Sequence, residues 1–220
     1  TAPSVEVLEI ASDDILNVEY NAGSGNFEIE YYDENLRVER ATVHADTRVF
    51  FNNVEIDDAE AIDFKPAQGS LKLVGNTSKT HFDYAYITSY RNFVVERINT
   101  LDEKLYDVYG EDFDLEAEFA EGYEFVKGGK ALKLEKVAEW DVISLPVARA
   151  NTAFAATANL VVTRKKAEGV VEAKTKNEYV VAGKAYELAP DYKAVVEEDS
   201  KEAAKLALGK GVTLYLDANG

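Results

Sequence analysis

The sequence predicts an all-β fold, mainly strands with short helices, built as two to three tandem small β-barrel-like modules. Three observations lead to this prediction. Apolar and polar residues alternate through much of the 220-residue chain, which is the period of half-buried strands. The 13 glycines and four prolines are spread between these runs and mark turns. An internal repeat at about 70 to 75 residues divides the chain into similar units.

The strands are expected mostly as hairpins. In residues 26–43, Phe27, Ile29 and Tyr31 alternate on one face before a polar turn returns the chain. Tyrosine and valine give several later runs the same strand propensity. These runs are 82–90, 93–98, 104–119 around a turn at Gly110, and 177–188 around Gly183-Lys184.

Helix is expected only in short turns and in one longer stretch, residues 200–208. The segment "EDSKEAAKLAL" has helical period, Asp199 or Ser200 is placed to cap its start, and Gly209 is placed to end it. We therefore expect helix in less than about a third of the chain.

The repeat defines the predicted modules. Three segments, 47–74, 122–147 and 191–216, each run from an aromatic and valine strand through a polar turn and a helical turn into a strand of alternating aliphatics. The lead-in 93–117 also resembles 167–189. About five strands a module are enough to close a small barrel. The predicted modules are a divergent N-terminal one at 1–85, then 86–162 and 163–220, with a boundary at the basic cluster Arg164-Lys165-Lys166.

The third module is expected to be truncated, as a piece of a longer protein. Val212, Leu214 and Leu216 form a strand pattern, and Asn219-Gly220 is a strong hairpin-turn signal with no strand after it. The middle module has such a strand in 155–166. The strand at 212–216 is therefore predicted to lie at a sheet edge, or to be completed by the N-terminal segment "SVEVLEI", residues 4–10.

Composition excludes several classes of function. A formal net charge of −17 repels phosphate backbones and anionic membranes, so nucleic acid is not an expected partner. No apolar run is long enough to span a bilayer, so membrane insertion is not expected. Cysteine is absent, which excludes disulfides, thiolate metal sites and thiol nucleophiles.

No catalytic, cofactor or metal site is predicted, and the chain is not expected to be an enzyme. His44 and His81 lack the spacing of a metal motif. With 41 acidic residues in the chain, neighbouring carboxylates indicate a solvated acidic face. The serines fit no nucleophile elbow, and "GSG" at 23–25 is expected to be a turn. The residues considered were Asp13-Asp14, Asp57-Asp58, Glu111-Asp112, Glu197-Glu198-Asp199, Ser12, Ser70, Ser89 and Ser144.

The 13 tyrosines and ten phenylalanines leave two interpretations open. Aromatic residues in strands mostly fill cores or form cross-strand pairs. A contiguous exposed row would instead provide a platform for sugar rings. Core packing is the preferred interpretation, and the single tryptophan, Trp140, is predicted to be buried at a barrel end.

Four stretches carry a resemblance to a known family: "FDYAYITSYRNFVVERINTLDEKLYDVYGEDFDLE", "YEFVKGGKALKLEKVAEWDVISL", "VEAKTKNEYVVAGKAYELAPD" and "VTLYLDANG". Over residues 46–220 the chain resembles the β modules of large Gram-positive, clostridial-type surface proteins that carry S-layer homology repeats. Two places depart from that pattern. Glu139-Trp140-Asp141 stands where the family reads glycine-acidic-valine. In "VGNTSKTHFDYAYI", residues 74–87, where many relatives carry an Asp/Asn-rich loop, only Asn76 and Asp83 remain as calcium-type ligands, fewer than calcium needs.

The resemblance implies an extracellular location at the cell surface or cell wall. It implies a non-catalytic structural or spacer segment whose partners are other surface-protein modules, or cell-wall polymer bound through repeats outside this chain. The alternative is an extracellular adhesin-like or carbohydrate-binding module with a glycan partner, whose binding residues the sequence does not identify. A contiguous patch of exposed aromatic side chains would favour binding.

Overall fold

The computed structural model describes residues 5–75, 81–110, 112–149, 157–175, 178–218 and 220. The chain is mostly β, with 52% strand and 12% helix, so the predicted all-β class is confirmed. The strands form three sheets of eleven, four and three strands. Among the described residues no closed barrel is found. The chain divides into two compact units.

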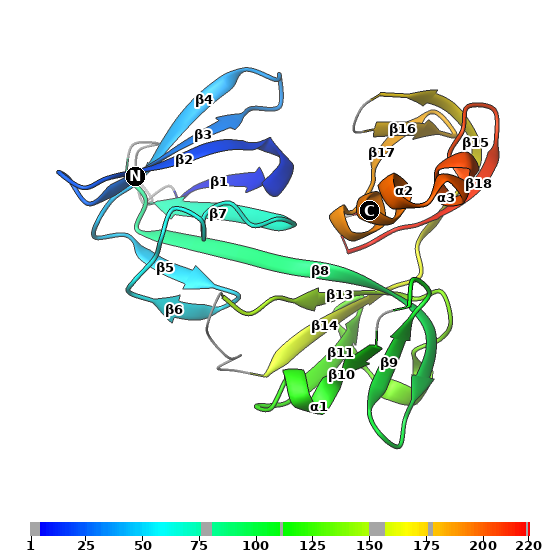
Figure 1. Cartoon of the computed structure of the whole chain (residues 1–220). Coiled ribbons are helices and arrows are strands. Elements are labelled where there is room, and N and C mark those ends of the chain that lie inside the picture. Colours follow the sequence, from blue (N-terminus) through cyan, green and yellow to red (C-terminus); the bar gives the residue numbers. More distant parts are fainter. Residues whose placement is uncertain (1–4, 76–80, 111, 150–156, 176–177, 219) are drawn as a thin grey trace. The chain divides into compact units, whose positions relative to one another are not determined.

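The first unit comprises residues 1–90 and 146–155 (Figure 1). A three-stranded antiparallel sheet, β2-β3-β4, shares one hydrophobic core with the strands β1, β7, β8, β5 and β6. Ile29, Phe64 and Leu71 are among its fully buried side chains. The elements are β1 Glu6–Ala11, the 3-10 turn η1 Ser12–Asp14, β2 Ile15–Asn21, β3 Asn26–Tyr32, β4 Val38–Val43, β5 Arg48–Phe51, β6 Val54–Ile56, β7 Gly69–Gly75 and the first part of β8 Tyr84–Asn99.

The second unit comprises residues 91–145 and 156–220. Its first half continues the eleven-stranded sheet in the order β8-β13-β14-β11-β12, with β9 and β10 paired beside β8. Phe93, Leu105 and Ile143 are buried there. The elements are β9 Lys104–Asp107, β10 Asp112–Asp114, α1 Leu115–Glu118, β11 Tyr123–Lys127, β12 Lys130–Leu132, the 3-10 turn η2 Leu134–Lys136, β13 Val142–Pro146 and β14 Ala158–Thr163.

The rest of the second unit is a four-stranded sheet in the order β17-β16-β15-β18, packed with two helices. Tyr179, Val181 and Leu206 are buried in its small core. The elements are β15 Lys166–Lys174, β16 Glu178–Val181, β17 Lys184–Glu187, α2 Pro190–Glu198, α3 Ser200–Lys205 and β18 Gly211–Tyr215.

The strand pairings repeat along the chain. In each repeat the first strand pairs with a strand near the end of the same repeat. These pairs are β1 with β7, β8 with β13, and β15 with β18. The next strand then adds antiparallel, as β8 on β7 and β14 on β13. The same added strand also pairs in parallel with β5 in the first repeat and with β11 in the second. Within the described residues the third repeat has no counterpart of this added strand.

The second and third repeats agree down to single hydrogen bonds. The Val95 amide donates to the Asp141 carbonyl at 2.9 Å, as the Val171 amide does to the Lys210 carbonyl at 2.9 Å. In the other direction, Trp140 donates to Val95 at 2.7 Å. Gly209 donates to Val171 at 2.9 Å. This correspondence pairs residue 140 with residue 209 and aligns β13 with β18.

One expected strand and the end of another are helical instead. The segment 191–216 is predicted to begin with a strand, but Pro190–Glu198 is the helix α2, with proline at its first position, where proline is favoured. Residues after Asp114 form the helical turn α1, because the Asp114 side chain accepts a hydrogen bond from the Ala117 amide. In the chain order, α2 and α3 of the third repeat take the place of the hairpin β11-β12 of the second repeat. The predicted helix near residue 200 is present as α3, with Asp199 as its N-cap.

Two expectations concerned the strand at residues 212–216. The structure confirms that β18 lies at a sheet edge, since β15 is its one partner among the described strands. The N-terminal segment does not complete it, because β1 pairs with β7 over Glu6–Ala11. Asn219 of the expected hairpin turn, and Ser4 of the N-terminal segment, lie outside the described residues. No sheet runs across residue 165, since β14 ends at Thr163 and β15 begins at Lys166.

Candidate functional site

A cluster of aromatic side chains occupies one face of the first unit. Strand β5 pairs in parallel with β8, which places Arg48 beside Tyr84 and Phe50 beside Tyr86. The intervening residues, such as Val49 and Ala85, point into the core. The pleat therefore turns the Arg48, Phe50, Tyr84 and Tyr86 side chains to the opposite face. We call Phe50, Tyr84 and Tyr86 the aromatic patch.

The three rings of the aromatic patch form a triangle. Ring centroids are 5.1 Å apart for Phe50 and Tyr86, 6.2 Å for Tyr84 and Tyr86, and 6.4 Å for Phe50 and Tyr84. The ring planes are tilted by 17° to 39°. Tyr86 is 36% exposed and the other two are half-buried. The three rings therefore lie side by side as a surface and do not stack in a single column.

An ion pair borders this patch. Arg48 Nε and Nη2 donate to the two carboxylate oxygens of Glu55 at 2.7 Å each, which is the bidentate geometry. The guanidinium carbon lies 5.4 Å from the Phe50 ring centroid and 5.7 Å from that of Tyr84. The hydrogen bond with Arg48 lowers the pKa of Glu55, so both groups are charged at neutral pH and hold each other beside the rings.

Trp140 is not core, contrary to the prediction. It is 36% exposed and stacks on Tyr215, with ring centroids 4.8 Å apart and planes 21° apart. Lys166 Nζ lies 4.7 Å from the same Tyr215 ring. Trp140 lies in the turn that precedes β13, with a φ of 66° in the left-handed region, so it is not one of the inward-facing residues of that strand.

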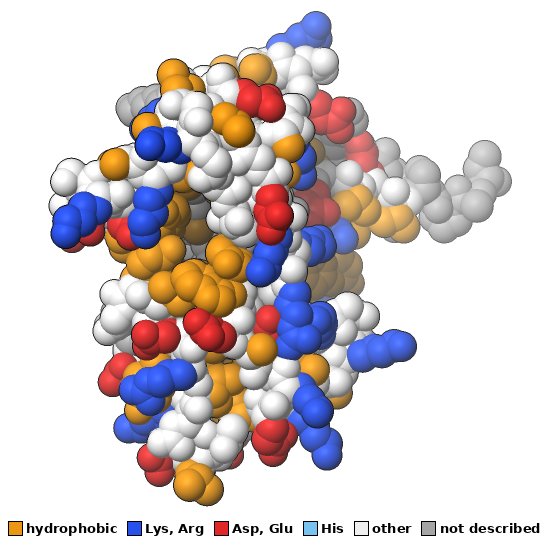
Figure 2. Space-filling view, turned by 90° about the vertical axis from the view of Figure 1, so that its right-hand side faces the viewer, with side chains coloured by type: hydrophobic (Ala, Val, Ile, Leu, Met, Phe, Trp, Pro, Cys, Tyr) orange, Lys and Arg blue, Asp and Glu red, His pale blue; other side chains and the backbone are white. Residues whose placement is uncertain are grey.

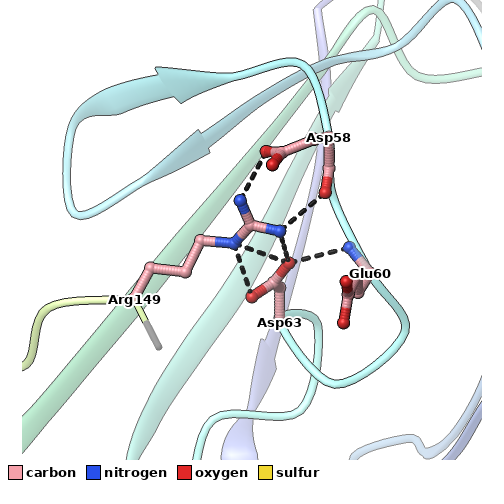
Figure 3. Close-up of polar contacts among 4 residues, drawn as sticks. All are labelled: Asp58, Glu60, Asp63 and Arg149. Carbon is pink, nitrogen blue, oxygen red and sulfur yellow. Dashed lines mark hydrogen bonds and ion pairs between the residues drawn. The ribbon is translucent and has the colours of Figure 1, made fainter. Parts of the chain in front are cut away.

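A second polar cluster fixes the chain segment that follows β13. Arg149 Nε donates to both carboxylate oxygens of Asp63 at 3.0 Å, and Arg149 also contacts the carboxylate and the carbonyl of Asp58 (Figure 3). The Glu60 amide donates to Asp63 at 2.7 Å. The side chains of Arg149 and Asp63 are 13% and 6% exposed. These carboxylates are engaged by a fixed positive charge, which suits anchoring and not acid–base chemistry.

The two histidines, far apart in sequence, lie together. Their ring centroids are 4.7 Å apart with planes 30° apart, and His81 Nε2 is 3.7 Å from Asp46 Oδ2. Nothing in the sequence spacing of His44 and His81 predicts this contact. No group of three or more His, Cys, Asp or Glu residues in the described part of the chain is arranged to hold a metal ion.

The other candidate acidic side chains lie on separate elements, and most of them are exposed. Asp13 and Asp14 lie in η1, where burial, reinforced by the Asp13 charge, raises the pKa of Asp14. Glu197 and Glu198 are exposed on α2. Asp57, Asp83 and Asp112 are exposed, while Glu111 and Asn76 lie outside the described residues.

The four serines also lie at separate places in the fold. Ser12 accepts a hydrogen bond from the Gly69 amide, and the Ser144 hydroxyl donates to Asn92. The Ser89 backbone is bound by the Asn52 side chain, and Ser70 is paired with Ala11 across β7 and β1. The "GSG" segment at 23–25 forms the predicted turn between β2 and β3.

Charged side chains of both signs share the face drawn in Figure 2. On the face drawn in Figure 2, acidic and basic side chains are interspersed with hydrophobic ones. None of the helices in the described parts is long and apolar enough to cross a membrane.

Comparisons with known proteins give no relatives from which to transfer a function. No family model, curated protein or solved structure matches the chain.

Proposed function

We propose that this chain is a non-catalytic structural segment of a bacterial cell-surface protein of the S-layer type. The observation that carries the proposal is the repeated pairing plan, β1·β7, β8·β13 and β15·β18. Tandem β repeats that follow one pairing plan and are joined through a shared strand, as β8 joins the first two, are suited to extend a chain as a spacer. The location is supported by the sequence resemblance and by the absence of cysteine.

Two experiments test this proposal. An antibody raised against residues 5–218 should label intact cells of the organism that encodes the chain. Labelling that requires permeabilised cells would contradict a surface location. Screens on glycans, peptides and esters should show background rates only. Reproducible turnover that disappears on a single change, such as Asp14→Asn, would contradict the non-catalytic role.

A second candidate function is favoured by the aromatic patch. A sugar ring presents a C–H face to aromatic rings and hydroxyl groups to charged side chains, and the patch offers both, with Arg48 and Glu55 at its border. The expected ligand is a neutral hexose polymer, because the chain carries a net charge of −17 that opposes anionic polymers.

Affinity electrophoresis in gels containing hydroxyethylcellulose, laminarin or galactomannan tests this second function. The chain should be retarded by at least one polymer, and Tyr86→Ala should remove the retardation. Tyr32→Ala is the matched control, because Tyr32 is similarly exposed, at 38%, but lies on β3. Equal retardation of the Tyr86 and Tyr32 variants would exclude the patch as the site.

A further inference from the structure

Strand β18 has one edge without a partner among the described strands. It pairs with β15 through the register Lys166 to Tyr215, Ala167 to Leu214 and Glu168 to Thr213, and it ends the sheet order β17-β16-β15-β18. In Figure 1 it lies beside β15 at the rim of its sheet. A sheet edge of this kind presents free N–H and C=O groups to a further strand.

Every second residue of β18 hydrogen-bonds to β15, and this alternation shows which backbone N–H and C=O groups face the free edge. The Leu216 amide donates to the Lys165 carbonyl at 3.0 Å, and the Val171 amide donates to Lys210 at 2.9 Å. In an antiparallel pair the bonded residues alternate. Val212 and Leu214 therefore bond to β15, and the backbone of Thr213 points to the open side.

In the first two repeats the corresponding edge is filled. Strand β7 is paired with β1 on one side and β8 on the other, and β13 with β8 and β14. The correspondence of Val95 with Val171 places Ser144 of β13 at the position of Thr213. Ser144 pairs with Val161 of β14. Strand β14 therefore shows which kind of strand fits the corresponding edge of β18.

We propose that the free edge of β18 binds an extended, positively charged peptide segment, which adds as an antiparallel strand. The segment should have aliphatic residues at alternating positions, as Leu160 and Val162 are in β14, where both are buried. It should carry a net positive charge, because this chain carries −17 and like charge would slow and weaken association. Backbone hydrogen bonds would supply affinity and the alternating side chains specificity.

This inference does not depend on the surface location or on the aromatic patch. Its probe is a fluorescently labelled peptide with the sequence TANLVVTRKK, residues 157–166, titrated with the whole chain by fluorescence anisotropy. We expect saturable binding. The matched control peptide carries Val161→Pro, which removes the amide that would bond to Thr213, and it should bind at least about tenfold more weakly.

A variant of the protein tests the position of binding. Thr213→Pro blocks the free edge without removing a hydrogen bond to β15, and it should reduce peptide binding at least about tenfold. Thr213→Val keeps the backbone amide and should bind normally. Hydrogen exchange should show the Thr213 amide becoming protected when the peptide is added.

Three results would overturn the inference. The first is no saturable binding of the peptide to the wild-type chain. The second is equal binding by the proline peptide or by a folded Thr213→Pro variant. The third is concentration-dependent dimerisation that Thr213→Pro abolishes, since a second copy of this chain would then be the occupant of the edge.

Discussion

Trp140 and Gly209 occupy the same backbone position in successive repeats. Their amides donate to Val95 and Val171 respectively, and their φ angles are 66° and 78°. Glycine adopts this left-handed region without strain, whereas a residue with a Cβ pays roughly 1 kcal/mol. Trp140 thus occupies a glycine position, and its stacking on Tyr215 offsets part of that strain.

This relationship predicts an unusual order of stabilities. Trp140→Ala loses the stacking, worth about 0.5 to 1.5 kcal/mol, and keeps the strain. Trp140→Gly loses the stacking but relieves the strain. We therefore expect Trp140→Gly to be about 1 kcal/mol more stable than Trp140→Ala, as measured by urea denaturation followed by circular dichroism. A glycine variant that is no more stable than the alanine variant would contradict the left-handed geometry.

Removing Arg149 should destabilise the first unit. Arg149→Gln leaves the Asp63 carboxylate, 6% exposed, without its counter-charge, and breaking such a buried pair costs about 3 kcal/mol. Asp58→Asn is the matched control. Its carboxylate is 75% exposed, so the loss should stay below about 1 kcal/mol. Urea denaturation measures both changes.

A double variant separates the charge effect from packing. Arg149→Met combined with Asp63→Leu removes both charges, so it should recover part of the stability lost in Arg149→Gln. If the double variant is no more stable than Arg149→Gln, packing and backbone contacts, and not the uncompensated charge, dominate this site.

Two tyrosines of the second unit should make its stability depend on alkaline pH. Tyr109 and Tyr192 contact each other, with ring centroids 5.2 Å apart, and burial, followed by the nearby Glu202 charge, raises the pKa of Tyr192 to about 12. An unfolded tyrosine ionises near about pH 10. Because the folded pKa is the higher one, this contribution is complete below pH 10 and is lost as the pH rises towards 12.

Tyr192→Phe tests this dependence. The variant has no proton to lose at that position, so its unfolding free energy should fall less steeply than that of the wild type between about pH 10 and 12. Denaturation curves at several pH values give the slopes. Identical slopes for the two proteins would show that Tyr192 ionises alike in the folded and unfolded chains.

The sequence was sufficient for the local elements. Alternation in segments such as 26–32 and the glycine turn at 183 predicts hairpins, because both signals are carried by neighbouring residues. The lead-in similarity of 93–117 and 167–189 likewise corresponds to the equivalent pairings of β8 and β15. Helix α2 was missed, because Tyr192, Val195 and Val196 have strand propensity, while the proline at its start and the packing of its apolar side override it.

The candidate sites could be predicted only in part. The aromatic patch depends on the parallel pairing of β5 with β8, whose residues are 36 positions apart, as Phe50 and Tyr86 are. No local pattern reports such a pairing. The contact of His44 with His81 has the same origin. Trp140 is exposed because it lies in the turn before β13, and its one sequence signal is the alignment with Gly209.

The alternation of hydrogen-bonded residues along β18 gives the last prediction, which concerns the stability of the protein without any ligand. Thr213 faces the free edge and Leu214 faces β15. Proline at position 213 removes no hydrogen bond of the sheet, so Thr213→Pro should keep the unfolding free energy within about 1 kcal/mol of the wild type, whereas Leu214→Pro removes a ladder bond and should cost about 3 kcal/mol or more. Chemical denaturation of both variants measures the difference. If the two prolines are equally damaging, the register of β18 on β15 differs from the one described, and the free edge presents other residues than Thr213.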